Sequence, residues 1–248
     1  MIENVLAYGE KHIQRVVPSG LIELSFYFGD KPQVVENQKS VLDHAVITGQ
    51  LNGYHDLLVT GQLSLFSIAS YPHGLADFIE MPIIELNNST VPLNDVLKQF
   101  SSQLVDELDN AETFEKRIQI IEQFLLGCLA RNRPSYNHER MQHCIKLINQ
   151  KKGRVDIDEL SAEACLSRKQ FERVFSNYVG ASPKQFLKTI RFQNAICQQS
   201  FANNSLAQVA CECGYYDQSH MNRDFAILAG MSPKNYMKVG EPFSDYFQ

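Results

Sequence analysis

The chain lacks the features that would assign it to a membrane, to secretion or to nucleotide chemistry. No run approaches about eighteen consecutive apolar residues, as a membrane-spanning helix would need. The first residues also do not show the basic and then apolar pattern of a secretory signal peptide. A glycine-rich phosphate loop and a nucleophile elbow are also missing. These absences predict a cytoplasmic protein without a membrane partner, and they leave no motif that would indicate an enzyme.

Paired cysteine or histidine spacing is also missing. Six cysteines are spread along the chain, which is typical of reduced structural thiols. Cys211 and Cys213 would point about 200° apart on a helix, so both sulfurs cannot easily hold one ion. His138 and His143 miss the i, i+4 spacing of a helical metal pair and are expected at the surface or packed. The sequence therefore predicts no metal and no cofactor.

The length and the charge distribution indicate two dissimilar halves. At 248 residues, with 44% apolar and 21% charged residues, the chain suits two globular domains. The net charge of -5 is unfavourable for a nucleic-acid binder. However, residues 1–136 carry nine Lys or Arg against seventeen Asp or Glu, a balance of -8, whereas residues 137–240 carry fourteen against nine, a balance of +5. Phosphate binding is therefore expected of the C-terminal half.

An internal repeat lies in this basic half, because residues 160–188 recur in degraded form at 209–238. Four features recur at an offset of fifty residues: the Ser-Pro-Lys run at 182–184 and 232–234, Gly180 and Gly230, Phe175 and Phe225, and Arg173 and Arg223. Upstream of the turn the offset falls to forty-nine, because Cys165 aligns with Gly214. The second copy therefore has a turn that is one residue longer, at Tyr216 or Asp217.

Each copy is expected to form a helix, a tight turn and a second helix, followed by a Gly-x-Ser-Pro segment that starts another helix. In the first copy Asp156 is the expected N-cap of a short helix, and Ser167 caps a second helix over 168–178. In the second copy Gly214 ends the first helix and Asp217 caps the second. This order predicts a tandem helix-turn-helix domain.

An apolar-periodic segment over 185–201 joins the two copies. As a helix it spans about 27 Å, close to the roughly 34 Å between successive major-groove faces on one side of B-DNA. The second helix of each copy is therefore expected to enter one of two adjacent major-groove segments. The alternative is a plain helical domain in which the repeat is only duplicated packing. The polar outward faces of both second helices argue against it.

The acidic half has a strand-like pattern. Residues 12–86 contain alternating runs that predict strands over 21–28, 41–47, 56–59 and 62–68, which favours a sandwich or small barrel. Helices are expected over 93–108 and 113–131. The second helix carries an apolar stripe of Phe114, Ile118, Ile121, Phe124, Leu125 and Leu129. That stripe is more typical of core than of interface, although a helix just before a linker is well placed to pair with a second chain.

Catalysis by this half has little support. His44, His55 and His73 lie in or beside expected strands, but no two of them have the His-x-His spacing that would place them on one face. A closed β-structure can hold one small ligand. A sensory pocket is therefore the more economical interpretation of the acidic half.

With the repeat laid out, residues 141–237 closely resemble the AraC/XylS family of bacterial transcriptional regulators. The resemblance rests on Leu-Ser, Phe-x-Arg-x-Phe and Gly-x-Ser-Pro elements within 166–183, and on Gly-Tyr-x-Asp-Gln-Ser-His-Met, Arg-x-Phe and Gly-x-Ser-Pro elements within 214–233. The departures are Ser161, Cys165 and Met221, which are small or volume-tolerant changes. The acidic half is similar to the β-barrel sensory domain of one branch of that family, through residues 17–24 and 122–126.

The resemblance implies DNA contacts on the outward faces of both second helices. In the first copy these residues are Arg168, Lys169, Glu172 and Arg173, and in the second copy they are Gln218, Ser219, Asn222 and Arg223. Such side chains suit base edges, because arginine pairs with guanine, asparagine or glutamine with adenine, and glutamate with cytosine. A structural or phosphate-positioning role stays open for Arg173 and Arg223, and a surface ion pair stays open for Glu172.

The predicted fold is α+β with two domains: a β-rich regulatory or dimerisation domain over 1–133, with helices after its strands, and an all-α tandem helix-turn-helix domain over 139–240. Residues 134–138 form the expected linker. The predicted function is sequence-specific regulation of transcription, with double-stranded DNA as partner. Contact with RNA polymerase for activation, a small-molecule effector and a homodimer are further expectations, and repression stays open. The alternative is a ligand-binding or enzymatic β-barrel whose helical half mediates protein contacts.

Overall fold

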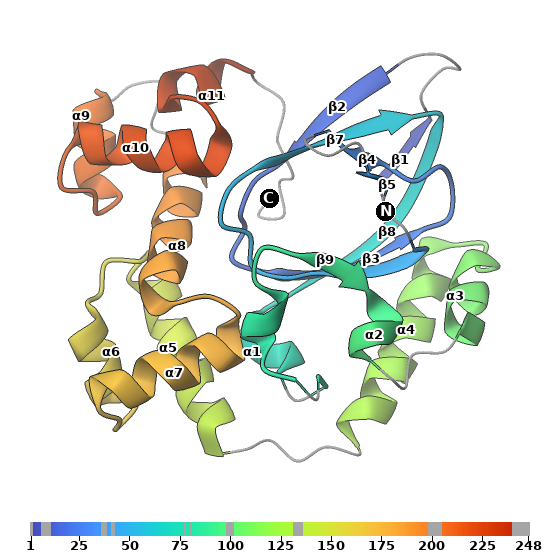
Figure 1. Ribbon diagram of the computed structural model, residues 1–248, viewed down its shortest axis with the longest axis horizontal. Helices are drawn as coiled ribbons and strands as arrows, with labels where there is room; N and C mark the ends of the chain where they lie inside the picture. The colour runs from blue at the N-terminus through green and yellow to red at the C-terminus, as the bar shows by residue number, and fades with distance from the viewer. Residues whose placement is uncertain are drawn as a thin grey trace.

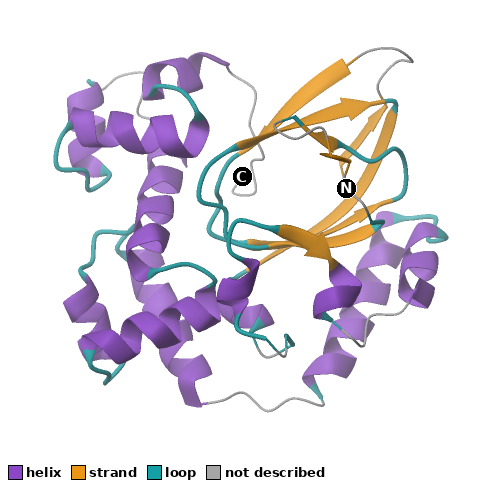
Figure 2. Ribbon diagram, in the orientation of Figure 1, coloured by secondary structure: helices purple, strands orange, loops and turns teal. Residues whose placement is uncertain are grey.

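The protein has a β-rich half followed by a helical half, as Figures 1 and 2 show. The structure is a computed structural model that describes residues 2–5, 11–35, 39–40, 43–76, 78–79, 81–97, 102–130, 136–197 and 205–239. None of the helices in these ranges is both long and apolar enough to cross a membrane.

The strands form two antiparallel sheets that face each other. The five-stranded sheet contains, in spatial order, β1 (Ile2–Val5), β8 (Gln62–Ser70), β3 (Ile22–Tyr27), β6 (Ala45–Thr48) and β9 (Thr90–Pro92). The four-stranded sheet contains β2 (Lys11–Val16), β7 (His55–Thr60), β4 (Gln33–Val34) and β5 (Lys39–Ser40). The β-rich N-terminal region, predicted as a sandwich or small barrel, is therefore confirmed as two antiparallel sheets.

Alternation along the strands gives the five-stranded sheet two different faces. Leu24 and Phe26 of β3 point away from the other sheet and join a core that the following helices cover. Tyr27 points between the sheets and packs against Val46 and Val59, so that it joins a small separate cluster. The larger apolar core of this half thus lies between a sheet and helices.

The helices of this half are α1 (Pro72–Leu75), the 3-10 turn η1 (Ile83–Leu86), α2 (Leu93–Val96), α3 (Ser102–Asp109) and α4 (Phe114–Leu129). The expected helix over 93–108 is wrong as a single element, because α2 ends at Val96 and Leu97 has a non-helical conformation. Residues 98–101 lie outside the described part. The expected helix over 113–131 agrees with α4, which Thr113 caps through a hydrogen bond from the Lys116 amide.

Most of the apolar stripe of α4 is core. Ile121 is buried, and Ile118, Phe124 and Leu125 pack against the same cluster as the sheet. Phe114 lies 5.8 Å from the Phe66 ring. The far end of the helix differs, because Leu126 and Leu129 are 63% and 48% exposed. Phe114, at the start of the helix, is 36% exposed, so the larger uncovered apolar surface of α4 is at its end.

The helical half contains α5 (Tyr136–Gln150), α6 (Ile157–Glu163), α7 (Arg168–Val179), α8 (Pro183–Cys197), α9 (Leu206–Glu212), α10 (Gln218–Ala229) and α11 (Pro233–Val239). Because α5 begins at Tyr136, residues 136–138 of the expected linker are helical, and 134–135 lie outside the described part. The joining helix α8 begins two residues earlier than expected and is described to Cys197. Residues 198–201 of the expected helix fall outside.

The two helix-turn-helix units have separate cores at the two ends of α8 (Figure 1). The first unit buries Phe171 and Phe175 of α7 together with Met141 and Ile145 of α5. The second buries Met221, Phe225 and Leu228 of α10, Phe192 of α8 and, from the β-rich half, Val17. Val17 is 2% exposed. The β-rich half therefore completes the core of the second unit.

Candidate nucleic-acid interface

The first helix-turn-helix unit is α6, a short turn and α7. The Asp156 carboxylate accepts a hydrogen bond of 2.7 Å from the Glu159 amide and caps α6. Ser167 and Gln170 form a reciprocal capping box at the start of α7. Both caps were expected from the sequence. They fix where α7 begins, and therefore which residues its first turn presents.

The outward face of α7 carries the four residues expected to contact DNA. Arg168, Lys169 and Arg173 are exposed and Glu172 is partly exposed. Arg168 is engaged within the protein, since its guanidinium lies 3.1 Å from Asp158 and 3.2 Å from Glu172. The Glu172 hydrogen bond and the Asp158 charge raise the pKa of Arg168. Such exposed ion pairs contribute little to stability. Arg168 can therefore leave these carboxylates for another anion at little cost.

The second unit is α9, a longer turn and α10. Ser205 and Gln208 form a capping box on α9, at a position the sequence reasoning did not single out although it matches Asp156 at the offset of forty-nine. The Asp217 carboxylate caps α10 and accepts from the His220 amide at 2.6 Å. The cap on α10 agrees with the expectation.

On α10, Gln218, Ser219 and Arg223 are exposed, and Asn222 is partly buried. The Arg223 Nε donates to the Ser219 carbonyl oxygen at 3.4 Å, a weak contact that leaves the guanidinium at the surface. The eight expected residues thus lie on two helices, four on each. Their roles toward DNA remain predictions.

The second unit has one feature that the sequence analysis predicted in part and two that it missed. Tyr216, one of the two residues expected to lengthen the turn, is 93% exposed directly before α10. Asp224 of α10 is buried, with Lys188 of α8 at 3.6 Å and His220 at 3.8 Å. Burial and the Asp224 charge raise the pKa of the neighbouring Tyr215. Only the longer turn had a sequence signal, namely the change of offset, because a charge one position before an inward phenylalanine reads as surface.

The electrostatics of the two helix starts suit an anionic partner unequally. A helix N-terminus presents free amides and a positive dipole end, which favour phosphate. The first turn of α7 adds Arg168 and Lys169, whereas α10 starts behind the negative Asp217 and carries Arg223 one turn later. We therefore expect α7 to attract phosphate more strongly than α10.

The cysteines and histidines behave as structural groups. Burial raises the pKa of Cys213 and of Cys144 to about 11. His143 lies at the surface, 3.0 Å from Glu163. His138 packs on His73, with ring centroids 5.8 Å apart. Within the described ranges, no three His, Cys, Asp or Glu side chains gather as metal ligands would.

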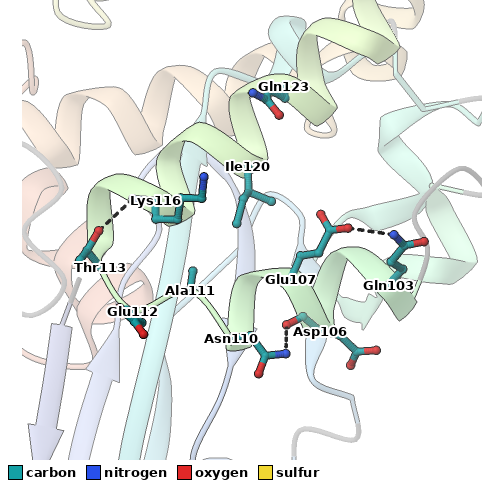
Figure 3. A pocket seen from close by; sticks show the side chains of 10 residues that line it. All are labelled: Gln103, Asp106, Glu107, Asn110, Ala111, Glu112, Thr113, Lys116, Ile120 and Gln123. Atoms are coloured by element: carbon teal, nitrogen blue, oxygen red, sulfur yellow. Dashed lines mark hydrogen bonds between the residues drawn. The ribbon is translucent and has the colours of Figure 1, made fainter.

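The β-rich half has one groove at its surface. The groove has a volume of about 870 Å³ and lies between α3 and α4. Figure 3 shows that polar side chains such as Asp106, Glu107 and Lys116 line most of it. It is open and polar, unlike the largely apolar cavities that enclose small ligands. The inner face between the sheets also carries polar groups, because Ser67 donates a hydrogen bond to Glu23 there. Burial and the Glu23 charge raise the pKa of Tyr27 on that face.

Comparisons with known proteins agree with this arrangement. Residues 160–238 match a family described as a helix-turn-helix domain, and residues 2–92 match a domain of unknown function (DUF6597). An uncharacterised HTH-type transcriptional regulator of Haemophilus influenzae is 27% identical over 202 residues, which cover 79% of this chain and 63% of that protein. An HTH-type transcriptional regulator of Mycobacterium tuberculosis is 34% identical over 83 residues, 34% of this chain and 32% of that protein. The chain thus spans less than two thirds of these relatives.

Among solved structures, the chain is similar to ToxT of Vibrio cholerae, with 10% identity, 92% of this chain and 97% of that chain covered, and a TM-score of 0.49. The DNA-binding domain of AdpA, solved in complex with a target DNA, is 26% identical. That match covers 40% of this chain and 90% of the other, with a TM-score of 0.38.

Proposed function

We propose that this chain is a helix-turn-helix transcriptional regulator of the AraC/XylS type, and that α7 and α10 read two adjacent major-groove segments of one duplex. The observation that carries the proposal is the placement of two polar-faced helices at the two ends of α8. At 15 residues, α8 is about 22 Å long. With the width of the flanking helices, this length suits a step of one DNA turn, roughly 34 Å.

Base readout is assigned to Arg168, Lys169, Glu172 and Arg173 on α7 and to Gln218, Ser219, Asn222 and Arg223 on α10. Of these, Arg173 and Arg223 are the sharpest candidates, because they occupy equivalent positions of the repeat and are exposed. Each precedes a fully buried phenylalanine by two residues, Phe175 or Phe225. The two side chains of each pair point about 200° apart, so truncating the arginine leaves the core intact.

Arg173→Ala and Arg223→Ala test this assignment. Each variant should lose about 1–3 kcal/mol of binding free energy on the specific site and relax preference at one base position, with an unchanged melting temperature. Binding is measured on fragments selected from the source genome and on random duplex over a salt series. Lys116→Ala, an exposed change on α4, serves as control and should alter neither. If either arginine variant loses affinity equally for both DNAs, that arginine contacts phosphate instead.

The β-rich half is assigned to regulation. Its balance of -8 makes it a poor partner for DNA, whereas the polar inner face around Glu23 offers a place for an effector, and the exposed Leu126 and Leu129 offer an edge for a second copy. We expect activation through RNA polymerase, in the bacterial cytoplasm. Sedimentation of the full chain with and without operator DNA, together with a thermal-shift screen of metabolites, tests both roles. A strict monomer that no metabolite stabilises would contradict them.

The alternative, a ligand-binding barrel whose helices only contact proteins, makes a different prediction. It requires no affinity for DNA that falls with salt. Two or more phosphate contacts would instead give a log-log salt slope of about -0.9 for each contact. A flat salt dependence would therefore favour the alternative.

A further inference from the structure

The β-rich half makes a hydrogen bond to each helix-turn-helix unit at the C-terminal end of its second helix. The Gly180 carbonyl oxygen, at the C-terminal end of α7, accepts a hydrogen bond of 2.6 Å from the Asn87 side-chain amide. The Ala229 carbonyl oxygen, at the C-terminal end of α10, accepts one of 2.9 Å from the Arg15 guanidinium. At an offset of fifty, Ala229 lies one residue before the equivalent of Gly180. Both donors therefore satisfy carbonyl groups that a helix end leaves without an internal partner.

Arg15 is held rigidly for this contact. Its guanidinium makes two hydrogen bonds of 2.7 Å to the Asp56 carboxylate, which lies directly opposite it in the β2–β7 register. The guanidinium also lies 4.2 Å from the centre of the Tyr54 ring. The Arg15 and Asp56 side chains are only 20% and 19% exposed. A cation fixed at a helix C-terminus is favourable, because the helix dipole is negative there.

The repeated glycines mark the same close approach. Gly180 and Gly230 both adopt positive φ, at 82° and 70°. A Cβ at Gly180 would lie 2.8 Å from Ile83 Cγ2, and a Cβ at Gly230 would lie 2.5 Å from the Tyr54 ring. Both atoms belong to the β-rich half. The glycines of the repeat thus allow the turn, and they also leave room for the other half of the molecule.

The joining helix is held from the same side. The Gln193 side-chain amide donates to the Pro18 carbonyl oxygen at 2.7 Å, and a Cβ at Gly20 would lie 3.0 Å from Ile190. The two units have separate cores, and they meet through α8 and where Arg154 of the first unit lies beside Gly214 of the second. Contacts from the β-rich half to α7, α8 and α10 add a third set of restraints on how the two units are oriented.

We propose that Arg15 and Asn87 are positioning residues that fix the separation and orientation of α7 and α10, so that the intact chain selects DNA sites with one fixed spacing. The proposal rests on the proposed function, because it presumes that both helices enter DNA. Arg15 should have the larger effect, since a charged donor makes a stronger hydrogen bond than the neutral amide of Asn87.

The test is selection of binding sites from random duplex DNA by the full-length wild type, Arg15→Ala, Asn87→Ala and the double variant. The quantity measured is the distribution of spacing between the two recognised segments, followed by affinity for the selected site with one base pair inserted. Arg117→Ala is the matched control. This arginine also donates to a main-chain carbonyl, that of Leu108 at 2.9 Å, and lies 4.5 Å from an aromatic ring, but it does so within the β-rich half.

The wild type and Arg117→Ala should select one spacing and bind the inserted site at least about tenfold more weakly, the factor that corresponds to one charge-assisted hydrogen bond. Arg15→Ala should broaden the distribution and lose most of that discrimination, and Asn87→Ala should do so to a smaller extent. A purely structural role would lower the melting temperature without changing the spacing.

Two results overturn the proposal: variants that keep the wild-type spacing distribution, or a wild type that accepts several spacings equally. A wild type that selects no DNA would instead overturn the proposed function, so the two failures are distinguishable. If Arg15→Ala does not fold, Asn87→Ala carries the same test, because it removes only a neutral donor from a partly exposed position.

Discussion

The two helix-turn-helix units descend from one sequence pattern but are built differently. The first unit draws its core from the helical half alone, with α5 covering α7. In the second, α8 covers α10, and Val17 of the β-rich half joins the buried cluster while Tyr54 packs against it. Two copies of one sequence motif therefore need not draw their buried cores from the same parts of the chain. The buried cluster of the first unit contains no residue of the β-rich half, whereas that of the second includes one about two hundred residues earlier in the chain.

The largest test of this difference is Val17→Asp. A carboxylate placed among Phe192, Phe225 and their neighbours has no cation to pair with in that cluster, so we expect a loss of about 3 kcal/mol or more in unfolding free energy. Hydrogen exchange should accelerate in α9 to α11 and much less in α5 to α7. Ile13→Asp is the control, since this side chain is 57% exposed. Equal acceleration in both units would show that they open together.

A second difference is the buried Asp224, which stands where the first unit has Val174. Its partner Lys188 lies 3.6 Å away and is 23% exposed. Asp224→Val should cost about 1–2 kcal/mol by leaving Lys188 without its partner, and Lys188→Met added to it should restore the wild-type stability or exceed it. Denaturant midpoints of the wild type, Asp224→Val, Lys188→Met and the double variant give the coupling free energy between the two side chains. Single effects that simply add would mean that the pair does not interact.

The smallest effect separates the two turns. Cys165 and Gly214 are equivalent, and both have positive φ, at 52° and 79°. Gly214→Ala should lower the free energy of unfolding by about 1–2 kcal/mol, because a side chain at positive φ is strained. The new Cβ would also lie 2.2 Å from Arg154 Cγ, so that the Arg154 side chain would have to move. Cys165→Gly should stabilise by about 0.5–1 kcal/mol, since relief of strain exceeds the added chain entropy. Thermal unfolding measures both, and shifts of the same sign would contradict the equivalence.

The sequence predicted the helical half well because its signals are local. Caps at Asp156, Ser167 and Asp217, and stop signals at Gly180 and Gly214, lie within a few residues of the ends they define. The β-rich half was less accessible. Strands β3, β6, β7 and β8 overlap expected strands. Strand β2 was missed, because its polar residues show no alternation and its partner β7 lies some forty residues later.

The site was predictable as a set of outward positions and not as a set of contacts. Exposure of Arg173 and Arg223 follows from their phase relative to Phe175 and Phe225. The engagement of Arg168 by Asp158, and that of Ala229 by Arg15, depend on which elements meet in space. No local pattern carries that information. The charge asymmetry between the halves predicted which half would bind DNA but could not reveal that the acidic half touches both units.

The contact between Arg15 and Ala229 joins residues 214 positions apart, and this separation has a consequence for the nascent chain. At about 5–20 residues per second, a ribosome needs roughly 11–43 s to make the second residue after the first. Strand β2 can pair with β7 early in that interval, while Val17 waits in water for the helix that will cover it. The first helix-turn-helix unit is completed sooner. The second unit therefore docks later than the first, onto a surface of the β-rich half that has already folded.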